Sequence, residues 1–271
     1  MAIKLRSAPA LEGGRWMLSG VQLARRAPLS LLGLMGFMFF GLGLLLALPW
    51  IGPLLVGVLM PALSGGWVLA VEALRAGRRP TPTHLMLPLF GRDRARLLLL
   101  GGLHAAAAAL TLGLAELIDP GLQAAWRSAM GPDVADEARL AAFQALQSGM
   151  LLRMALIVPV LLLFWHAPVI LLREGGSVAR ALFASAVASV RNLAAFVIYG
   201  AAWVAADLLL SLTLGVLLAA LGLAAWAPFF AMPAALFFSA AFYASLHASV
   251  YGCLSFEEPP EASDTTADPA A

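Results

Sequence analysis

The sequence predicts an all-α polytopic membrane protein with six transmembrane helices, arranged as three hairpins that are each preceded by an interfacial amphipathic segment. The composition is the first reason, since 62% of the 271 residues are hydrophobic and only 12% are charged. Soluble domains are nearer a quarter charged. The second reason is length, because six apolar stretches can each span ~30 Å of hydrocarbon at ~1.5 Å per residue. These stretches are residues 28–49, 52–74, 97–117, 150–172, 193–217 and 226–250.

The distribution of basic residues predicts how the chain is threaded. Residues 1–27, 75–96 and 173–192 hold 14 of the 17 lysines and arginines, whereas the tight turns at 49–53 and 222–228 hold none. The positive-inside rule therefore places the three basic regions, and with them both termini, in the cytoplasm. Residues 1–11 contain no apolar core of signal-peptide length, so we expect the first stretch to remain as a helix. The single cysteine, Cys253, excludes a disulfide framework.

Three domains follow from these features. Residues 1–27 form a cytoplasmic N-terminal segment with an amphipathic helix, in which Trp16 and Gly20 share one face and Arg15 the other. Such a basic, tryptophan-bearing helix is typical of the headgroup plane. Residues 28–255 form the six-helix domain, with an external loop at 118–149. Residues 256–271, rich in acids and prolines, are predicted to be a disordered cytoplasmic tail.

The hairpins also repeat in sequence, which indicates three related units. The second and fourth stretches match at a constant offset of 98, through Pro61, Trp67, Arg75 and Gly77 against Pro159, Trp165, Arg173 and Gly175. The sixth stretch repeats only the start, at Pro233, and His247 falls where the arginine would be. Segments resembling 12–27 precede the other hairpins at 80–96 and 176–192. We therefore expect a proline-kinked second helix in every hairpin.

The external loop carries two helix-start signals. Asp119-Pro120 and Pro132-Asp133 both combine a capping aspartate with a proline suited to a first helical turn. We therefore expect two short surface helices within 118–149. Our interpretation is a lid over the bundle without a ligand of its own.

Asp207 is the most informative ionisable residue, because it lies deep in the fifth stretch. Tyr199, Trp203, Asp207 and Ser211 follow one another at four-residue spacing and form a polar-aromatic stripe. A charge at this depth requires a partner or a function. Arg153 is the partner we favour for a structural ion pair, and Glu116 is the rival. The alternative is a proton or substrate site on Asp207.

Three histidines and one acid suggest a weaker hypothesis, a zinc site. His104, His166, His247 and Glu72 fall at a similar predicted depth, and imidazole with carboxylate suits zinc. No local motif such as HExxH supports it, and single histidines also form hydrogen bonds between helices. We favour that second interpretation and expect no metal or cofactor. The arginines of 75–96 are interpreted as contacts to anionic lipid headgroups, not to nucleic acid.

Several segments resemble a family of uncharacterised six-helix bacterial inner-membrane proteins, known as a domain of unknown function. The resemblance lies in GRWMLSG at 14–20, in PALSGGWVLAVEALRAGRRPTPTHLMLPLF at 61–90, and in FWHAPVILLREGGSVARALFASAVASVRNLAAF at 164–196. It extends over residues 12–255 and implies a multi-pass protein of the bacterial inner membrane, with no catalytic residues to carry over. The acidic tail departs from the shared pattern.

The functional hypothesis is an integral inner-membrane protein without enzymatic activity, with a structural, scaffolding or envelope-homeostasis role. Its candidate partners are the lipid bilayer, a second copy of the chain or another membrane protein. The alternative is a transporter or channel for a small solute or proton that uses Asp207. Only one acid lies deep in the spans, which counts against coupled transport.

The predicted threading can be tested with alkaline phosphatase fusions. A fusion after Leu140 should be active, because the positive-inside rule places the 118–149 loop outside the cytoplasm. Fusions after Arg79 or Gly176 should be silent. Phosphatase activity at Arg79 would overturn this topology.

Overall fold

The computed structural model of the protein describes residues 2–131 and 134–257 and confirms an all-α polytopic membrane protein. Six of its helical segments are long and apolar enough to cross a membrane. The helices are α1 (Glu12–Arg26), α2 (Pro28–Leu46), α3 (Ile51–Arg75), α4 (Pro82–Phe90), α5 (Arg94–Ile118), α6 (Leu122–Met130), α7 (Asp136–Phe164), α8 (Ala167–Glu174), α9 (Val178–Arg191), α10 (Leu193–Ala220) and α11 (Ala227–Cys253). The spans are α2, α3, α5, α7 continued by α8, α10, and α11 with the preceding 3-10 turn, Ala224–Trp226.

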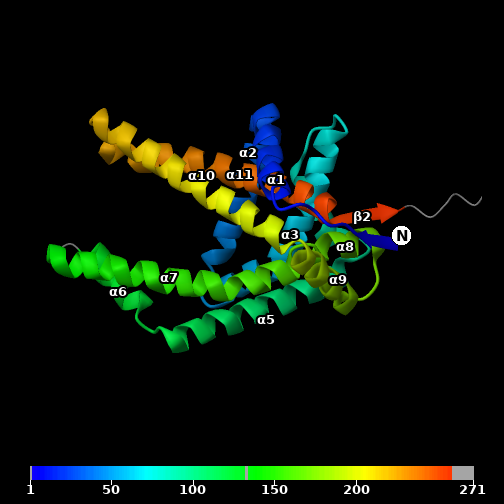
Figure 1. Ribbon diagram of the computed structural model, residues 1–271, viewed down its shortest axis with the longest axis horizontal. Helices are drawn as coiled ribbons and strands as arrows, with labels where there is room; N and C mark the ends of the chain where they lie inside the picture. Colours follow the sequence, from blue (N-terminus) through cyan, green and yellow to red (C-terminus); the bar gives the residue numbers. More distant parts are fainter. Residues whose placement is uncertain (1, 132–133, 258–271) are drawn as a thin grey trace, which may run out of the picture.

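The two ends of the described chain pair with each other, which the sequence did not predict. Strand β1 (Ala2–Leu5) runs antiparallel to β2 (Leu254–Glu257), with Leu5 opposite Leu254. Strand β2 includes the first two residues of the predicted disordered tail at 256–271, and the remainder of that tail lies outside the described residues. Figure 1 shows this sheet at one end of the molecule, here called the terminal end, with α6 at the opposite, far end.

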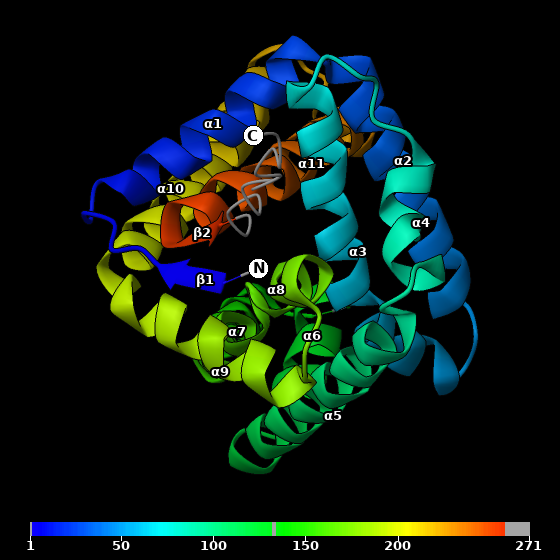
Figure 2. The same cartoon turned by 90° about the vertical axis from the view of Figure 1, so that its right-hand side faces the viewer.

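The helices form three units that are linked in a ring. Unit one comprises α1 to α3, unit two α4 to α8, and unit three α9 to α11. Each unit's first, short helix packs on the second spanning helix of the preceding unit: α4 on α3, α9 on α7 and α8, and α1 on α11. Figure 2 shows α1, α4 and α9 at the periphery, with α3, α8 and α11 nearer the centre. The contact of α1 with α11 joins the first unit to the last.

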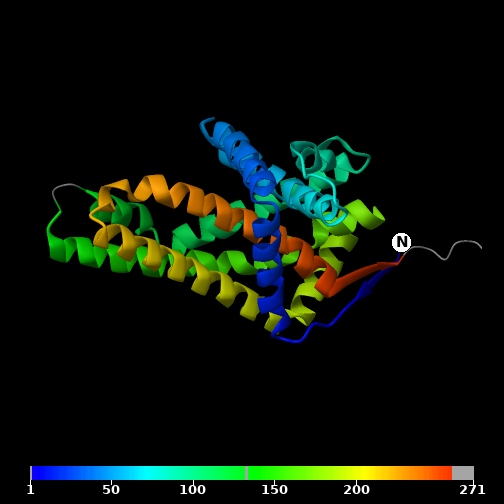
Figure 3. The ribbon, with the colours of Figure 1, turned by 90° about the horizontal axis from the view of Figure 1, so that it is seen from above.

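Helix α1 packs so closely on α10 and α11 that only glycine fits at two positions. A Cβ atom on Gly13 would lie 2.0 Å from the carbonyl oxygen of Ala195, and one on Gly20 would lie 2.2 Å from that of Ala241. Trp16, only 2% exposed, sits between them and meets the rings of Phe196 and Tyr199. The apolar face of α1, predicted to meet lipid, therefore packs on protein. Figure 3 shows α1 crossing the α10–α11 hairpin steeply.

Unit two contains a break in its second spanning helix, between α7 and α8. The backbone N–H of His166 donates to the hydroxyl of Ser185 at 3.0 Å, so the Leu162 carbonyl loses its helical partner. Ser189 of α9 donates to that carbonyl at 2.9 Å instead. Because unsatisfied backbone groups are costly within a membrane, these serines make the break tolerable. Helix α9 of unit three thus supplies the hydrogen bonds that are missing at the break in unit two.

The predicted 118–149 loop is more helical than expected. Helix α6 is one of the two surface helices predicted there, following Asp119-Pro120. The second does not exist separately, because α7 begins at Asp136 and continues uninterrupted to Phe164. Pro132 and Asp133, the predicted second helix start, lie outside the described residues.

The first spanning helix of unit three is packed differently from its counterparts. Helix α2 packs on α11 and α5 packs on α3, but α10 makes no comparably extensive contact with α7 within the described ranges. As a result, the apolar window of α10 is 11% buried, against 22% for the windows of α2 and α5. Helix α10 therefore presents the least covered surface of the six spans.

Replacing Gly20 by leucine should destabilise the protein by about 1–3 kcal/mol or more, because the side chain would meet the α11 backbone. Gly14 is the matched control, since a Cβ there meets nothing within 4 Å. Gly14→Leu should be neutral or slightly stabilising through helix propensity. Unfolding of both variants in detergent, followed by circular dichroism, measures the difference. Equal stabilities would contradict the close packing of α1 on α11.

Candidate functional site

A polar junction at the terminal end joins the three units through one residue from each. Arg173 of α8 forms an ion pair with the Glu72 carboxylate of α3. Its guanidinium also donates to the hydroxyl oxygen of Tyr251 on α11 at 3.2 Å. That hydroxyl in turn donates to Glu72 at 2.6 Å. The three side chains therefore form a closed set of contacts, here called the inner junction.

Another residue of the internal repeat lies beside the inner junction. The His247 ring packs on that of Tyr251, with centroids 4.6 Å apart. Arg173 and His247 occupy matching positions of the second and third repeats, and both contact Tyr251. Arg75 holds the matching position of the first repeat and is exposed.

The four side chains of the zinc hypothesis do not meet at one point. Glu72 belongs to the inner junction and His247 packs on its Tyr251, whereas the His104 ring forms a hydrogen bond with the Gly57 carbonyl at 2.8 Å. His166 is fully buried in the α7–α8 break and packs beside Phe196. Within the described ranges, no three His, Cys, Asp or Glu side chains gather closely enough to hold an ion. Similar depth along separate helices did not bring these side chains to a common point.

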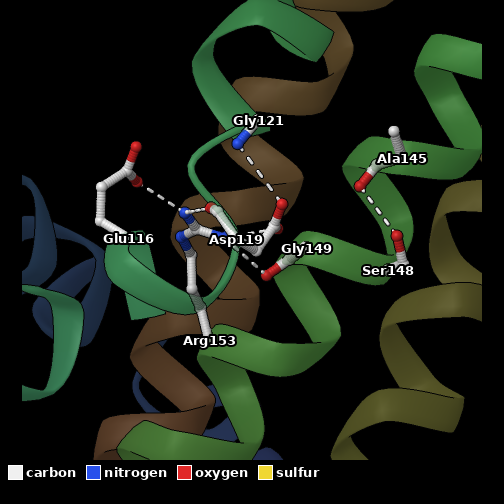
Figure 4. A network of polar contacts seen from close by, with 7 residues as sticks. All are labelled: Glu116, Asp119, Gly121, Ala145, Ser148, Gly149 and Arg153. Atoms are coloured by element: carbon white, nitrogen blue, oxygen red, sulfur yellow. Dashed lines mark hydrogen bonds and ion pairs between the residues drawn. The ribbon is translucent and has the colours of Figure 1, made fainter. Parts of the chain in front are cut away.

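A second polar cluster lies at the far end around Arg153 of α7 (Figure 4). Its guanidinium donates to Glu116 at 2.7 Å and to the Asp119 carboxylate at 3.1 Å. It also donates to the carbonyls of Asp119 and Gly149, at 2.9 and 3.1 Å. The favoured pairing of Arg153 with Asp207 is therefore wrong, and the rival partner Glu116 is the one observed. Arg153 faces α5 and the α5–α6 turn, away from α10. The sequence interpretation treated Asp119 as a helix cap and missed its pairing with Arg153, although its place just after the third stretch was a signal.

The stripe around Asp207 divides into a buried half and an exposed half. Tyr199 and Trp203 are buried, and the Tyr199 hydroxyl lies 2.6 Å from that of Ser245 on α11. Asp207 and Ser211 lie on the exposed surface of α10. Within the part of the chain that the structure describes, no side chain pairs with the Asp207 carboxylate. The residue predicted to be locked inside the bundle therefore faces outward.

The fold, its six apolar spans and its charged ends define a multi-pass integral membrane protein. Over 265 residues the chain is 31% identical to a probable inner membrane protein of Burkholderia thailandensis, and the alignment covers 95% of this chain and 96% of that protein. The chain belongs to the family of this probable inner membrane protein, which agrees with the resemblance to uncharacterised bacterial membrane proteins. No family model matches the chain. No solved structure matches it either.

The inner junction can be tested with a double-mutant cycle on Glu72→Gln and Arg173→Gln. Because the two side chains are in direct contact, their effects on the free energy of unfolding should be non-additive by about 0.5–3 kcal/mol. The control cycle combines Asp207→Asn with Arg153→Gln, which do not touch. Its effects should be additive within experimental error. The reverse pattern, coupling at Asp207 and none at Glu72, would contradict both assignments.

Proposed function

We propose that this protein is a non-enzymatic scaffold of the bacterial inner membrane that binds another membrane protein through the exposed surface of α10. In this proposal both termini lie in the cytoplasm, since most arginines cluster near the terminal end. The observation that carries the proposal is Asp207, a carboxylate exposed on an otherwise apolar helix.

The position of Asp207 makes contact with lipid unfavourable. It lies about 21 Å from the start of α10, at ~1.5 Å per residue, and therefore deep within a span. Its neighbours Leu208 and Leu209 are 63% and 67% exposed, so the surrounding surface is apolar. A charged side chain at such depth costs about 2.5–3.5 kcal/mol on insertion scales. A partner that satisfied the carboxylate would remove this cost.

The chemistry of Asp207 also indicates what kind of helix would cover it. Two copies packed through α10 about a two-fold axis would bring two carboxylates together, which repel unless one is protonated. A spanning helix with a hydrogen-bond donor at this depth, such as Ser, Asn, Lys or Arg, would satisfy the carboxylate instead. We therefore favour a different membrane protein over a second copy as the partner.

The transport alternative receives less support from the position of Asp207. A solute pathway would require the carboxylate to line a cavity between helices. Asp207 instead lies on the outer surface of α10, and it is not among the residues lining the cavities between α3, α5, α7 and α11. At the terminal end Arg173 forms an ion pair with Glu72, and at the far end Arg153 forms one with Glu116.

Photo-crosslinking in membranes tests the scaffold proposal. A photoreactive amino acid at Leu208 should give a discrete adduct with one protein, mapped to a spanning helix that carries a donor. Asp207→Leu should abolish this adduct, whereas Asp207→Asn, which still accepts a hydrogen bond, should retain part of it. Leu110 on α5, 76% exposed, is the control position and should give lipid adducts. Lipid adducts alone at both positions would overturn the proposal, and an adduct between two copies would replace the partner by a homodimer.

A further inference from the structure

A long groove runs between α5 and α7 and is lined by α6 at the far end. It has a volume of about 850 Å³, within the usual range for small-molecule sites. Four α5 residues at helical spacing line one wall: His104, Ala108, Leu112 and Glu116. Met150, Met154 and Leu161 of α7 line the opposite wall. The groove is thus apolar along most of its length and charged at one end.

The length of the groove matches one leaflet of a bilayer. From His104 to Glu116 the α5 wall rises by about 18 Å at ~1.5 Å per residue. Half of the hydrocarbon core is ~15 Å thick. The charged end also carries Trp126 of α6, 55% exposed, a residue type enriched at the membrane surface. These dimensions fit a single acyl chain whose headgroup lies at the far end.

The charges at the far end select the kind of headgroup. Arg153 already donates to two carboxylates and two carbonyls, and its side chain is only 13% exposed. Its N–H groups are therefore largely occupied and leave little room to donate to a lipid phosphate. Glu116 and Asp119 remain 56% and 35% exposed. With one arginine against two carboxylates, the formal charge of this cluster is −1, which favours a cation.

From the groove and its charged end we infer that α5, α6 and α7 form a binding site for an aminophospholipid. One acyl chain lies between Ala108 and Met154, and the ammonium group of the headgroup contacts Glu116. The groove opens on the face formed by α5, α6 and α7, not on the exposed surface of α10. This inference is therefore independent of the proposed partner of Asp207.

The site can be tested with photoreactive phosphatidylethanolamine, carrying a diazirine in one acyl chain, and the purified full-length protein in nanodiscs. Labelling should map to α7 peptides around Met154. Ala108→Phe fills the groove and should reduce this labelling by about fivefold or more, whereas Ala109→Phe, on the exposed side of the same helix, should not. A roughly fivefold change corresponds to about 1 kcal/mol. Equal labelling of both variants would show annular lipid only and would overturn the inference.

The headgroup part of the inference has its own variant. In the native protein, unlabelled phosphatidylethanolamine should compete with the photoreactive lipid several-fold better than phosphatidylglycerol. Glu116→Gln keeps a hydrogen-bond acceptor for Arg153 but removes one negative charge, so it should lower that preference about threefold to fivefold. Equal competition by the two lipids in the native protein would overturn the assignment of an amine headgroup. Because Glu116 is largely exposed, this variant should fold even if Ala108→Phe does not.

Discussion

The close approach of α1 to the backbone of α11 is the constraint on which the rest of the architecture depends. Inside a bilayer, apolar helices gain nothing from leaving lipid for each other, so small residues and close packing must hold them together. Gly20 supplies that closeness on α11, Gly13 supplies it on the neighbouring α10, and Trp16 fills the space between them. The contact joins unit one to unit three and turns three hairpins into a ring. In the closed ring α3 also packs on α8 and α11, and Glu72, Arg173 and Tyr251, from three different units, meet at the inner junction.

Most of the fold could be predicted from the sequence, because each of its signals is local. Span length and the short amphipathic helices depend on neighbouring residues alone, and both appear in the structure. The sequence did not correctly predict which side chains contact each other between helices that are distant in the chain. Arg153 was matched to Asp207 by depth, yet it turns toward Glu116 and Asp119 on the adjacent α5. The histidines were likewise matched by depth. The sequence does not show how each helix is rotated about its axis, and His104 and His166 point to different neighbours. The strand pairing of β1 with β2 joins segments about 250 residues apart, beyond the reach of any local pattern.

Three charged sites of the spanning helices differ in their degree of compensation. At the inner junction and around Arg153, each carboxylate faces an arginine and several further hydrogen-bonding groups. Such networks fix the relative positions of the helices that carry them. Asp207 stands apart, because the helix that presents it is also the least covered of the six spans. Among the described residues, a carboxylate without a pairing side chain and a sparsely packed helix thus coincide on α10, which distinguishes the lateral surface of unit three from those of units one and two.

The ring also sets an order of events during synthesis. Helix α1 is synthesised before α11, and the surface that receives it, around Ala241 and Ser245, is made more than 200 residues later. At 5–20 residues per second, Trp16 and its flanking glycines wait roughly 10 to 45 seconds for their partner. A chain that stalls after unit two would keep this apolar face uncovered at its N-terminus. The burial of Trp16 therefore depends on the last hairpin, which is synthesised after every other spanning helix.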